Sequence, residues 1–174
     1  MPLTDSLREA VLREALPIPG TSFQGVAVVI DTNVILDLIF WKDPAASDLM
    51  HAMDEGLVTP LRDRESMIEL AEVLSRPHFL ASEAAAVSAV AAWCARTTPV
   101  DEDRVSEAEH TITVRCRDPL DQKFLVLALA GRSPLLVTKD KLVLKAGKKM
   151  GRYGTRAVRP EDVKTALETL RAAA

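Results

Sequence analysis

The sequence predicts an α/β fold built on a parallel sheet, and three observations lead to this class. Two continuous runs, VAVVI at 26–30 and LLVT at 135–138, show no alternation of apolar and polar residues. Such runs are typical of strands that helices cover on both faces. Segments with helical spacing separate the runs, and strands that alternate with helices indicate a parallel sheet. The 174 residues are enough for one domain with a substantial core.

The individual elements follow from apolar spacing and from the residues that start and stop them. Strands are expected at 26–30, 57–59, 111–114, 135–138 and 156–158. Helices are expected at 4–16, 34–40, 62–75, 82–96, 118–130 and from 160 onwards. Residues 97–110, rich in Thr, Pro and acids, are expected to be irregular. Ser6 and Glu9 fit a capping box, and residues 17–20 stop the first helix, so residues 1–24 are expected to form an N-terminal helical extension.

Composition limits the classes of protein to which the chain can belong. Apolar residues make up 48% of it and charged residues 27%, a balance that excludes a disordered protein. No apolar run is long enough to span a membrane, and charged residues interrupt any signal-peptide core. Cys94 and Cys116 have no metal-type spacing and suit a reducing compartment, so a cytoplasmic protein is expected. Trp41 and Trp93 are expected in the core or at an interface.

Charge is distributed unevenly along the chain. Residues 132–159 contain nine Lys or Arg and one acid, whereas the part before them is acidic. A basic stretch on an acidic body is typical of nucleic-acid binding. A solvated loop is an equally good explanation on charge alone.

Acidic residues follow two predicted strands at the point where each strand ends. Asp31 and Asp140 are expected to meet if their strands are neighbours, because ligands of parallel sheets bind beyond the carboxyl ends of the strands. Asp121 and Glu69 are further candidates on the helices at 118–130 and 62–75. Several carboxylates in one crevice require a cation, and oxygen ligands select Mg²⁺ or Mn²⁺.

Each of these acids also has a purely structural explanation. Asp31 and Asp118 are suitable helix N-caps, and Asp121 is an acid in a first helical turn. Glu69 shares one helix face with Glu65 and Glu72, as a solvated polar stripe would. The joint placement of the acids after successive strands is what favours a functional site.

Four segments in series resemble the PIN-domain (PilT N-terminal-like) nucleases, most closely the toxin components of bacterial type II toxin–antitoxin systems. They are VVIDTNVILDLIF, IELAEVLSRPHF, CRDPLDQKFLVLALAG and LLVTKDK. The resemblance implies a three-layer α/β/α sandwich with a five-stranded parallel sheet, formed by residues 25–174. It also implies an endoribonuclease that depends on one or two Mg²⁺ or Mn²⁺ ions, and it makes a cognate antitoxin and a homodimer the expected protein partners.

The resemblance also assigns roles to individual residues. It implies that Asp31, Glu69, Asp121 and Asp140 are the catalytic metal ligands, with Asp118 an additional candidate. Thr32, Asn33 and Thr138 would orient these carboxylates. RNA-binding residues are expected in the basic stretch: Lys139, Lys141, Lys145, Lys148, Lys149, Arg152 and Tyr153.

Two departures from the family pattern favour a second interpretation. Leu120 and Leu142 stand where this branch usually carries further acids. The alternative is therefore a weakly active or inactive module of the same fold that binds RNA or protein.

Overall fold

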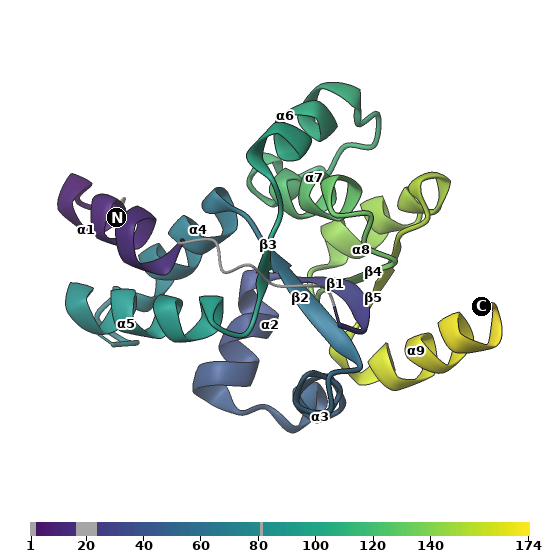
Figure 1. Ribbon diagram of the computed structural model, residues 1–174, viewed down its shortest axis with the longest axis horizontal. Helices are drawn as coiled ribbons and strands as arrows, with labels where there is room; N and C mark the ends of the chain where they lie inside the picture. Colours follow the sequence, from purple (N-terminus) through teal and green to yellow (C-terminus); the bar gives the residue numbers. More distant parts are fainter. Residues whose placement is uncertain (1–2, 17–23, 81) are drawn as a thin grey trace.

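The computed structural model describes residues 3–16, 24–80 and 82–174. Within these residues the centre of the molecule is a five-stranded parallel sheet in the order β3-β2-β1-β4-β5 (Figure 1). Its strands are β1 (Val26–Ile30), β2 (Val58–Arg62), β3 (Thr98–Pro99), β4 (Leu135–Val137) and β5 (Arg156–Val158). The predicted parallel sheet is confirmed, and β1 and β4 are neighbours as the site prediction required.

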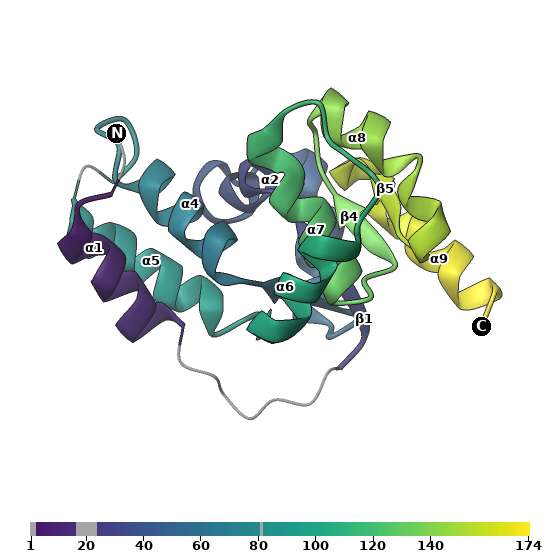
Figure 2. The same cartoon turned by 90° about the horizontal axis from the view of Figure 1, so that it is seen from above.

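Helices cover both faces of this sheet, which confirms the three-layer α/β/α sandwich (Figures 1 and 2). One layer contains α1 (Asp5–Ala10), α2 (Thr32–Leu36), α3 (Ser47–Asp54), α4 (Arg64–Leu74), α5 (Glu83–Cys94) and α9 (Val163–Ala172). The other contains α6 (Glu102–Thr111), α7 (Gln122–Ala130) and α8 (Lys141–Gly147). A π-helical turn at Val11–Ala15 continues α1, and another at Asp37–Trp41 continues α2.

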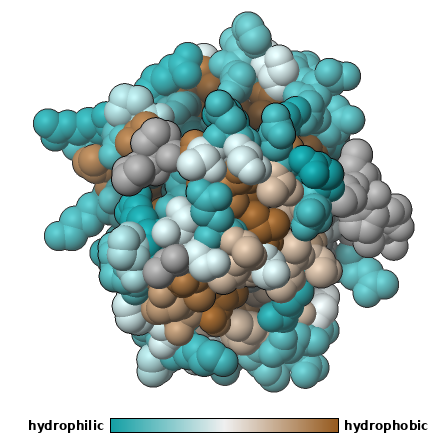
Figure 3. Space-filling view, turned by 90° about the vertical axis from the view of Figure 1, so that its left-hand side faces the viewer, coloured by the Kyte–Doolittle hydropathy of each residue, from teal (hydrophilic) through white to brown (hydrophobic). Residues whose placement is uncertain are grey.

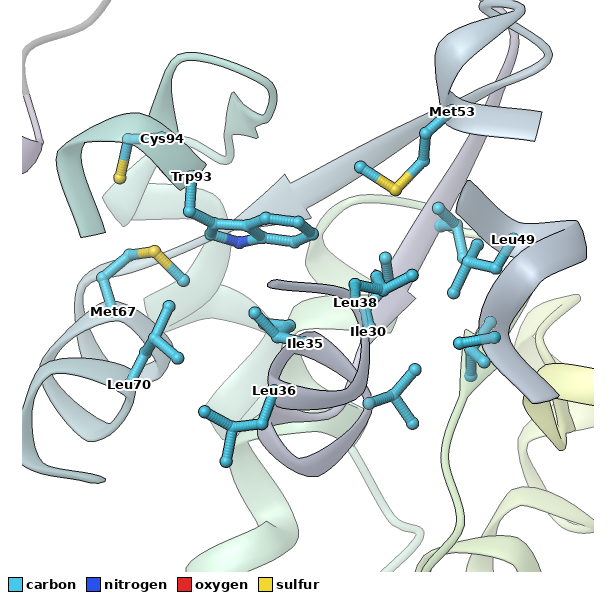
Figure 4. Packing of buried hydrophobic residues seen from close by; sticks show 14 of the residues in the cluster. Ile30, Ile35, Leu36, Leu38, Leu49, Met53, Met67, Leu70, Trp93 and Cys94 are labelled. Atoms are coloured by element: carbon cyan, nitrogen blue, oxygen red, sulfur yellow. The ribbon is translucent and has the colours of Figure 1, made fainter. Parts of the chain in front are cut away.

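Alternate residues of β1 face the two layers. Val28 and Ile30 lie in the core beneath α2 to α5, whereas Val29 packs on the opposite side against Phe124 of α7. In the larger core, Trp93 of α5 lies beside the α4 side chains Met67 and Leu70 (Figure 4). Trp93 is thus in the core, as predicted. Both faces of β1 pack against helices and are shielded from solvent, which explains its uninterrupted apolar sequence.

The N-terminal helix belongs to the same core as the sheet. Leu7, Val11 and Ala15 are buried in it, and α1 lies along α5 (Figure 2). The N-cap is Thr4, whose hydroxyl accepts a hydrogen bond from Leu7 N, rather than the predicted Ser6. The predicted stop at 17–20 lies outside the described residues, and the domain division after residue 24 stays a prediction.

Two assignments between residues 97 and 114 were wrong. The third strand is Thr98–Pro99, and the segment after it is a helix, α6, rather than irregular chain. Asp101 starts α6, because its side chain accepts hydrogen bonds from Asp103 N and Arg104 N.

Residues 112–116 have no strand partner in the described part of the chain, although Ile112, Val114 and Cys116 are buried. The side chain of Gln122 replaces a neighbouring strand: it accepts from Cys116 N at 2.7 Å and donates to Val114 O at 3.0 Å. The alternating apolar residues of this segment therefore reflect burial of every second side chain, and the segment forms these backbone hydrogen bonds without a neighbouring strand. No helix among the described residues has the length and apolar character needed to cross a membrane.

Candidate active site

The register of β1 and β4 brings Asp31 beside Thr138. Ile30 pairs with Val137, so the next residue of each strand lies at the carboxyl edge of the sheet. Thr138 Oγ1 donates a hydrogen bond of 2.6 Å to Asp31 Oδ2, and Asn33 N donates to Asp31 Oδ1 at 2.9 Å. Asp31 is only 3% exposed. Burial raises the pKa of its carboxyl group, and the two hydrogen bonds oppose this effect.

The same threonine also holds the second strand-end aspartate. Thr138 Oγ1 accepts a hydrogen bond from Asp140 N at 3.0 Å. The side chain of Asp140 caps α8, where it accepts from Leu142 N and Val143 N. Asp31 caps α2, as its structural explanation predicted, and Asp140 caps α8, a role that the sequence analysis did not assign to it. The functional role of the two aspartates stays a prediction. Leu142, which replaces an acid of the family pattern, packs against the smaller core.

A further pair of acids comes from the chain before α7. Asp118 caps the short helix Pro119–Asp121, accepting a hydrogen bond from Leu120 N at 2.9 Å. The pKa of Asp121 is raised to about 6, first by burial and then by the negative charges of Asp31, Asp118, Asp140 and Glu69. The carboxylates of Asp31, Asp118, Asp140 and Glu69 therefore lie within range of electrostatic interaction with Asp121.

Glu69, on α4, is paired with a cation from α7. Its carboxylate forms an ion pair with Lys123 Nζ, which also donates a hydrogen bond to Leu120 O. The Lys123 side chain is only 11% exposed. An ion pair shielded from water in this way is screened less than a surface pair. Lys123 therefore neutralises part of the negative charge of the site.

The predicted residues fit a divalent cation by the chemistry of their donors. The carboxylate and hydroxyl oxygens are the ligands that Mg²⁺ and Mn²⁺ prefer. Beside Asp31, the hydroxyl of Thr32 is buried and has no hydrogen-bond partner among the described residues. No three His, Cys, Asp or Glu side chains of residues 3–16, 24–80 and 82–174 are already arranged to hold a metal ion. Glu69, one of the predicted ligands, forms an ion pair with Lys123 in this arrangement.

The predicted RNA-binding residues fall into two groups. Lys141, Lys145, Lys148 and Lys149 are exposed on α8 and just after it, and Lys139 precedes the helix. Arg152 and Tyr153 are instead bonded to Thr113: the tyrosine hydroxyl accepts from Thr113 N at 2.9 Å, and Arg152 Nη1 donates to Thr113 Oγ1 at 3.1 Å. These two residues hold the segment after α6 against the C-terminal part of the domain.

Sequence reasoning missed two charged residues near the site. Asp63 directly follows β2 and caps α4, repeating the arrangement of Asp31 and Asp140. Burial raises the pKa of its carboxyl group, whereas hydrogen bonds from Ser66 and the charge of Lys123 lower it. The signal was present in the sequence, but the predicted strand at 57–59 ended too early to reach Arg62. Lys123 had a weaker signal, as a lone cation in the first turn of an apolar helix.

Comparisons with known proteins agree with this architecture. A chain in the crystal structure of VapBC2 from Rickettsia felis bound to a DNA fragment from their promoter superposes with a TM-score of 0.51 and 13% sequence identity. The similarity covers 77% of this chain and 98% of that chain, and at this identity it shows the fold alone. The curated proteins contain no match. The family model described as PIN domain matches residues 27–142, and the chain therefore belongs to the PIN-domain family.

Proposed function

We propose that this chain is an endoribonuclease that requires Mg²⁺ or Mn²⁺ and acts as the toxin of a type II toxin–antitoxin pair. One observation supports the proposal: carboxylates from three other segments lie within electrostatic range of Asp121, and their negative charges contribute to raising its pKa to about 6. PIN-domain proteins are generally nucleases, which supports hydrolysis of a phosphodiester bond.

Asp31, Glu69, Asp121 and Asp140 would hold one or two cations in this proposal, with Asp118 as an additional ligand. Such ions lower the pKa of water and stabilise negative charge on phosphate oxygens. The protein contributes rigid placement: Thr138 orients Asp31 and the backbone of Asp140. Thr32 and Asn33, at the start of α2, complete the surroundings of Asp31. The exposed lysines of α8 supply contacts to the RNA backbone.

Replacing Asp31 tests the proposal. Asp31→Asn should abolish RNA cleavage in Mg²⁺ or Mn²⁺ and preserve the fold, because the amide oxygen can still accept from Asn33 N. Its NH₂ group can donate to Thr138 Oγ1 in place of the present hydrogen bond. The matched control is Asp48→Asn, an exposed residue of α3. Cleavage by Asp31→Asn at the parental rate would show that the assignment of the cation site is wrong.

The alternative is a weakly active module that binds RNA or protein. It is favoured by Leu120, which is 75% exposed where the family usually has an acid, and by the ion pair that occupies Glu69. Thermal melts at increasing Mn²⁺ concentration separate the two functions, since a ligand that prefers the folded state raises the melting temperature. A nuclease site of four carboxylates requires this rise, and Asp31→Asn should remove it.

Protein partners belong to the same proposal: a cognate antitoxin and a second copy of the chain in a two-fold dimer. The similar fold was solved in VapBC2 bound to promoter DNA. The end of this molecule that carries α1, α4 and α5 has apolar side chains gathered in a band rimmed by hydrophilic ones (Figure 3). Continuous apolar surface of this kind is typical of protein contacts. Sedimentation at tens of micromolar should therefore show a species larger than 19.0 kDa.

A further inference from the structure

A cavity of about 310 Å³ adjoins the candidate active site. Its lining includes two aromatic residues, Trp41 and Phe79, together with the site aspartate Asp140 and two residues close to site aspartates in the chain, Asn33 and Lys139. Its volume lies at the lower end of the range for small-molecule sites, roughly 300–1,000 Å³. One cavity therefore joins an aromatic wall to the edge of the proposed cation site.

The aromatic wall is preformed but largely open to solvent. Trp41 ends the turn that continues α2, and it is 58% exposed, in contrast to the buried Trp93. Its ring packs edge-on with Phe40 at a centroid distance of 4.8 Å and with Phe79 at 5.8 Å. Phe40 and Phe79 also contact each other at 5.1 Å, so the three rings hold one another in place.

A lysine that is paired with an aspartate lies at the same cavity, and both residues line it. Lys139 Nζ is 2.5 Å from Asp37 Oδ2, and the Asp37 side chain is buried. This ion pair holds the lysine at the cavity that Trp41, Phe79 and Asp140 also line, while part of the lysine stays in contact with solvent. An aromatic platform beside a cation is the combination that binds unpaired nucleotides, through base stacking and phosphate contacts.

We propose that Trp41 and Phe79 form the wall of a nucleobase subsite, so that one unpaired base of a single-stranded RNA stacks there while the neighbouring phosphate lies at the carboxylates. This inference rests on the proposed nuclease function and adds a base-binding subsite to it. Bases in a duplex are already stacked on their neighbours and cannot enter a side cavity. Asn33 adds an amide that can donate to or accept from a base edge.

The polar lining favours RNA over a protein segment as the occupant. Lys139 and Asp140 both line the cavity, and an apolar helix face in it would leave both charged residues desolvated. A nucleotide would suit both residues: its phosphate can accept from the N–H donors of Lys139 that Asp37 does not use, and Asp140 would be a ligand of the proposed cation, which stabilises negative charge on phosphate oxygens.

The test measures binding without cleavage. A fluorescently labelled RNA of about six nucleotides is titrated with protein in EDTA, for the parent, Trp41→Ala and Trp41→Phe. Stacking on one base is worth about 1–3 kcal/mol, so Trp41→Ala should weaken binding by about five- to 150-fold. Trp41→Phe keeps an aromatic ring and should lose less. The same RNA in a duplex should bind the parent and Trp41→Ala equally.

A second series identifies the stacked base. Binding is compared for RNAs that each lack the base at one position. Removal of the stacked base should weaken binding to the parent but cause no further loss of affinity in Trp41→Ala, because the effects of removing two partners that contact each other are not additive. Equal abasic losses in both proteins would overturn the subsite. The subsite would also be overturned if Trp41→Ala bound RNA as tightly as the parent but no longer self-associated in sedimentation. That result would make this surface a protein interface. Either outcome is compatible with RNA cleavage by the parent protein. If the nuclease proposal were wrong, the parent protein would not cleave RNA at all.

Discussion

At the scale of single residues, Thr138 connects the two strand-end aspartates. Its side chain is 0% exposed, and its hydroxyl donates to Asp31 Oδ2 and accepts from Asp140 N. Thr138→Val has nearly the same shape but leaves both groups without this partner, which should cost about 1–3 kcal/mol of stability. Mn²⁺ affinity should fall by about 10- to 100-fold, as it does when the supports of metal ligands are removed.

Urea unfolding and calorimetric Mn²⁺ titration measure these two effects. Thr138→Ser keeps the hydroxyl and serves as the control. If Thr138→Val matched Thr138→Ser in both stability and affinity, the hydroxyl would not position the aspartates.

The charge of Asp121 predicts a pH dependence of stability. Its pKa is raised from 3.8 to about 6, first by burial and then by the surrounding carboxylates. Between these two values the folded protein still holds a proton that the unfolded chain has lost, so this carboxyl costs stability as the pH rises from about 4 to 6. Asp121→Asn has no such cost.

In EDTA, the melting temperature of Asp121→Asn relative to the parent should therefore increase from pH 4 to about 6.5 and then remain constant. Melts across this range check the prediction, with the exposed Asp48→Asn as control. A difference that does not change with pH would contradict the assigned pKa.

At the scale of elements, α1 should contribute to global stability although it lies outside the region that the family model matches. Leu7 is buried in the larger core with residues of α4 and α5. Leu7→Ala should destabilise the fold by about 2–5 kcal/mol, because it removes buried methyl groups and leaves a cavity. Denaturant unfolding measures this loss, and Arg8→Ala on the exposed face should change little. Equal stability of the two variants would mean that α1 detaches independently.

The elements that could be predicted from the sequence are those with long local patterns. The fully apolar β1 and β4 and the amphipathic segment at 4–16 have such patterns. In contrast, β3 has only two residues, one of them a proline, and pairs with the end of β2 at the edge of the sheet. A strand this short has no periodicity, and its hydrogen bonds depend on a neighbour more than thirty residues earlier in the chain.

At the scale of the whole molecule, α8 determines where the basic stretch lies relative to the site. Asp140 caps the helix, so Lys141 begins it directly beside this aspartate, Lys145 lies in its last turn, and Lys148 and Lys149 follow that turn. Seven residues at 1.5 Å each make α8 about 10 Å long. If the chain cleaves RNA as proposed, the strand can therefore extend from the carboxylates along these lysines.

Replacing Lys145, Lys148 and Lys149 together with Gln should weaken RNA binding and reduce its salt dependence. Each phosphate contact on a single strand contributes a slope of about −0.7 to a log–log salt plot, so the slope should flatten by up to about two. Titrations at several salt concentrations measure it, and Mn²⁺ affinity should stay nearly unchanged, since none of the three is a proposed ligand. An unaltered slope would place the RNA on another surface.

The sequence by itself determined the fold class, the order of the acids along the chain and the positions of Asp31 and Asp140 at strand ends. These properties are local, because a strand, its final residue and the cap of the next helix lie within a few residues of one another. Only the tertiary structure decided which charges meet. The pairing of Glu69 with Lys123, the exposure of Trp41 beside Asp140 and the attachment of Tyr153 to Thr113 join segments about 40 to 100 residues apart. Their contacts depend on how the helices pack across the sheet, and no periodicity in the chain records that packing.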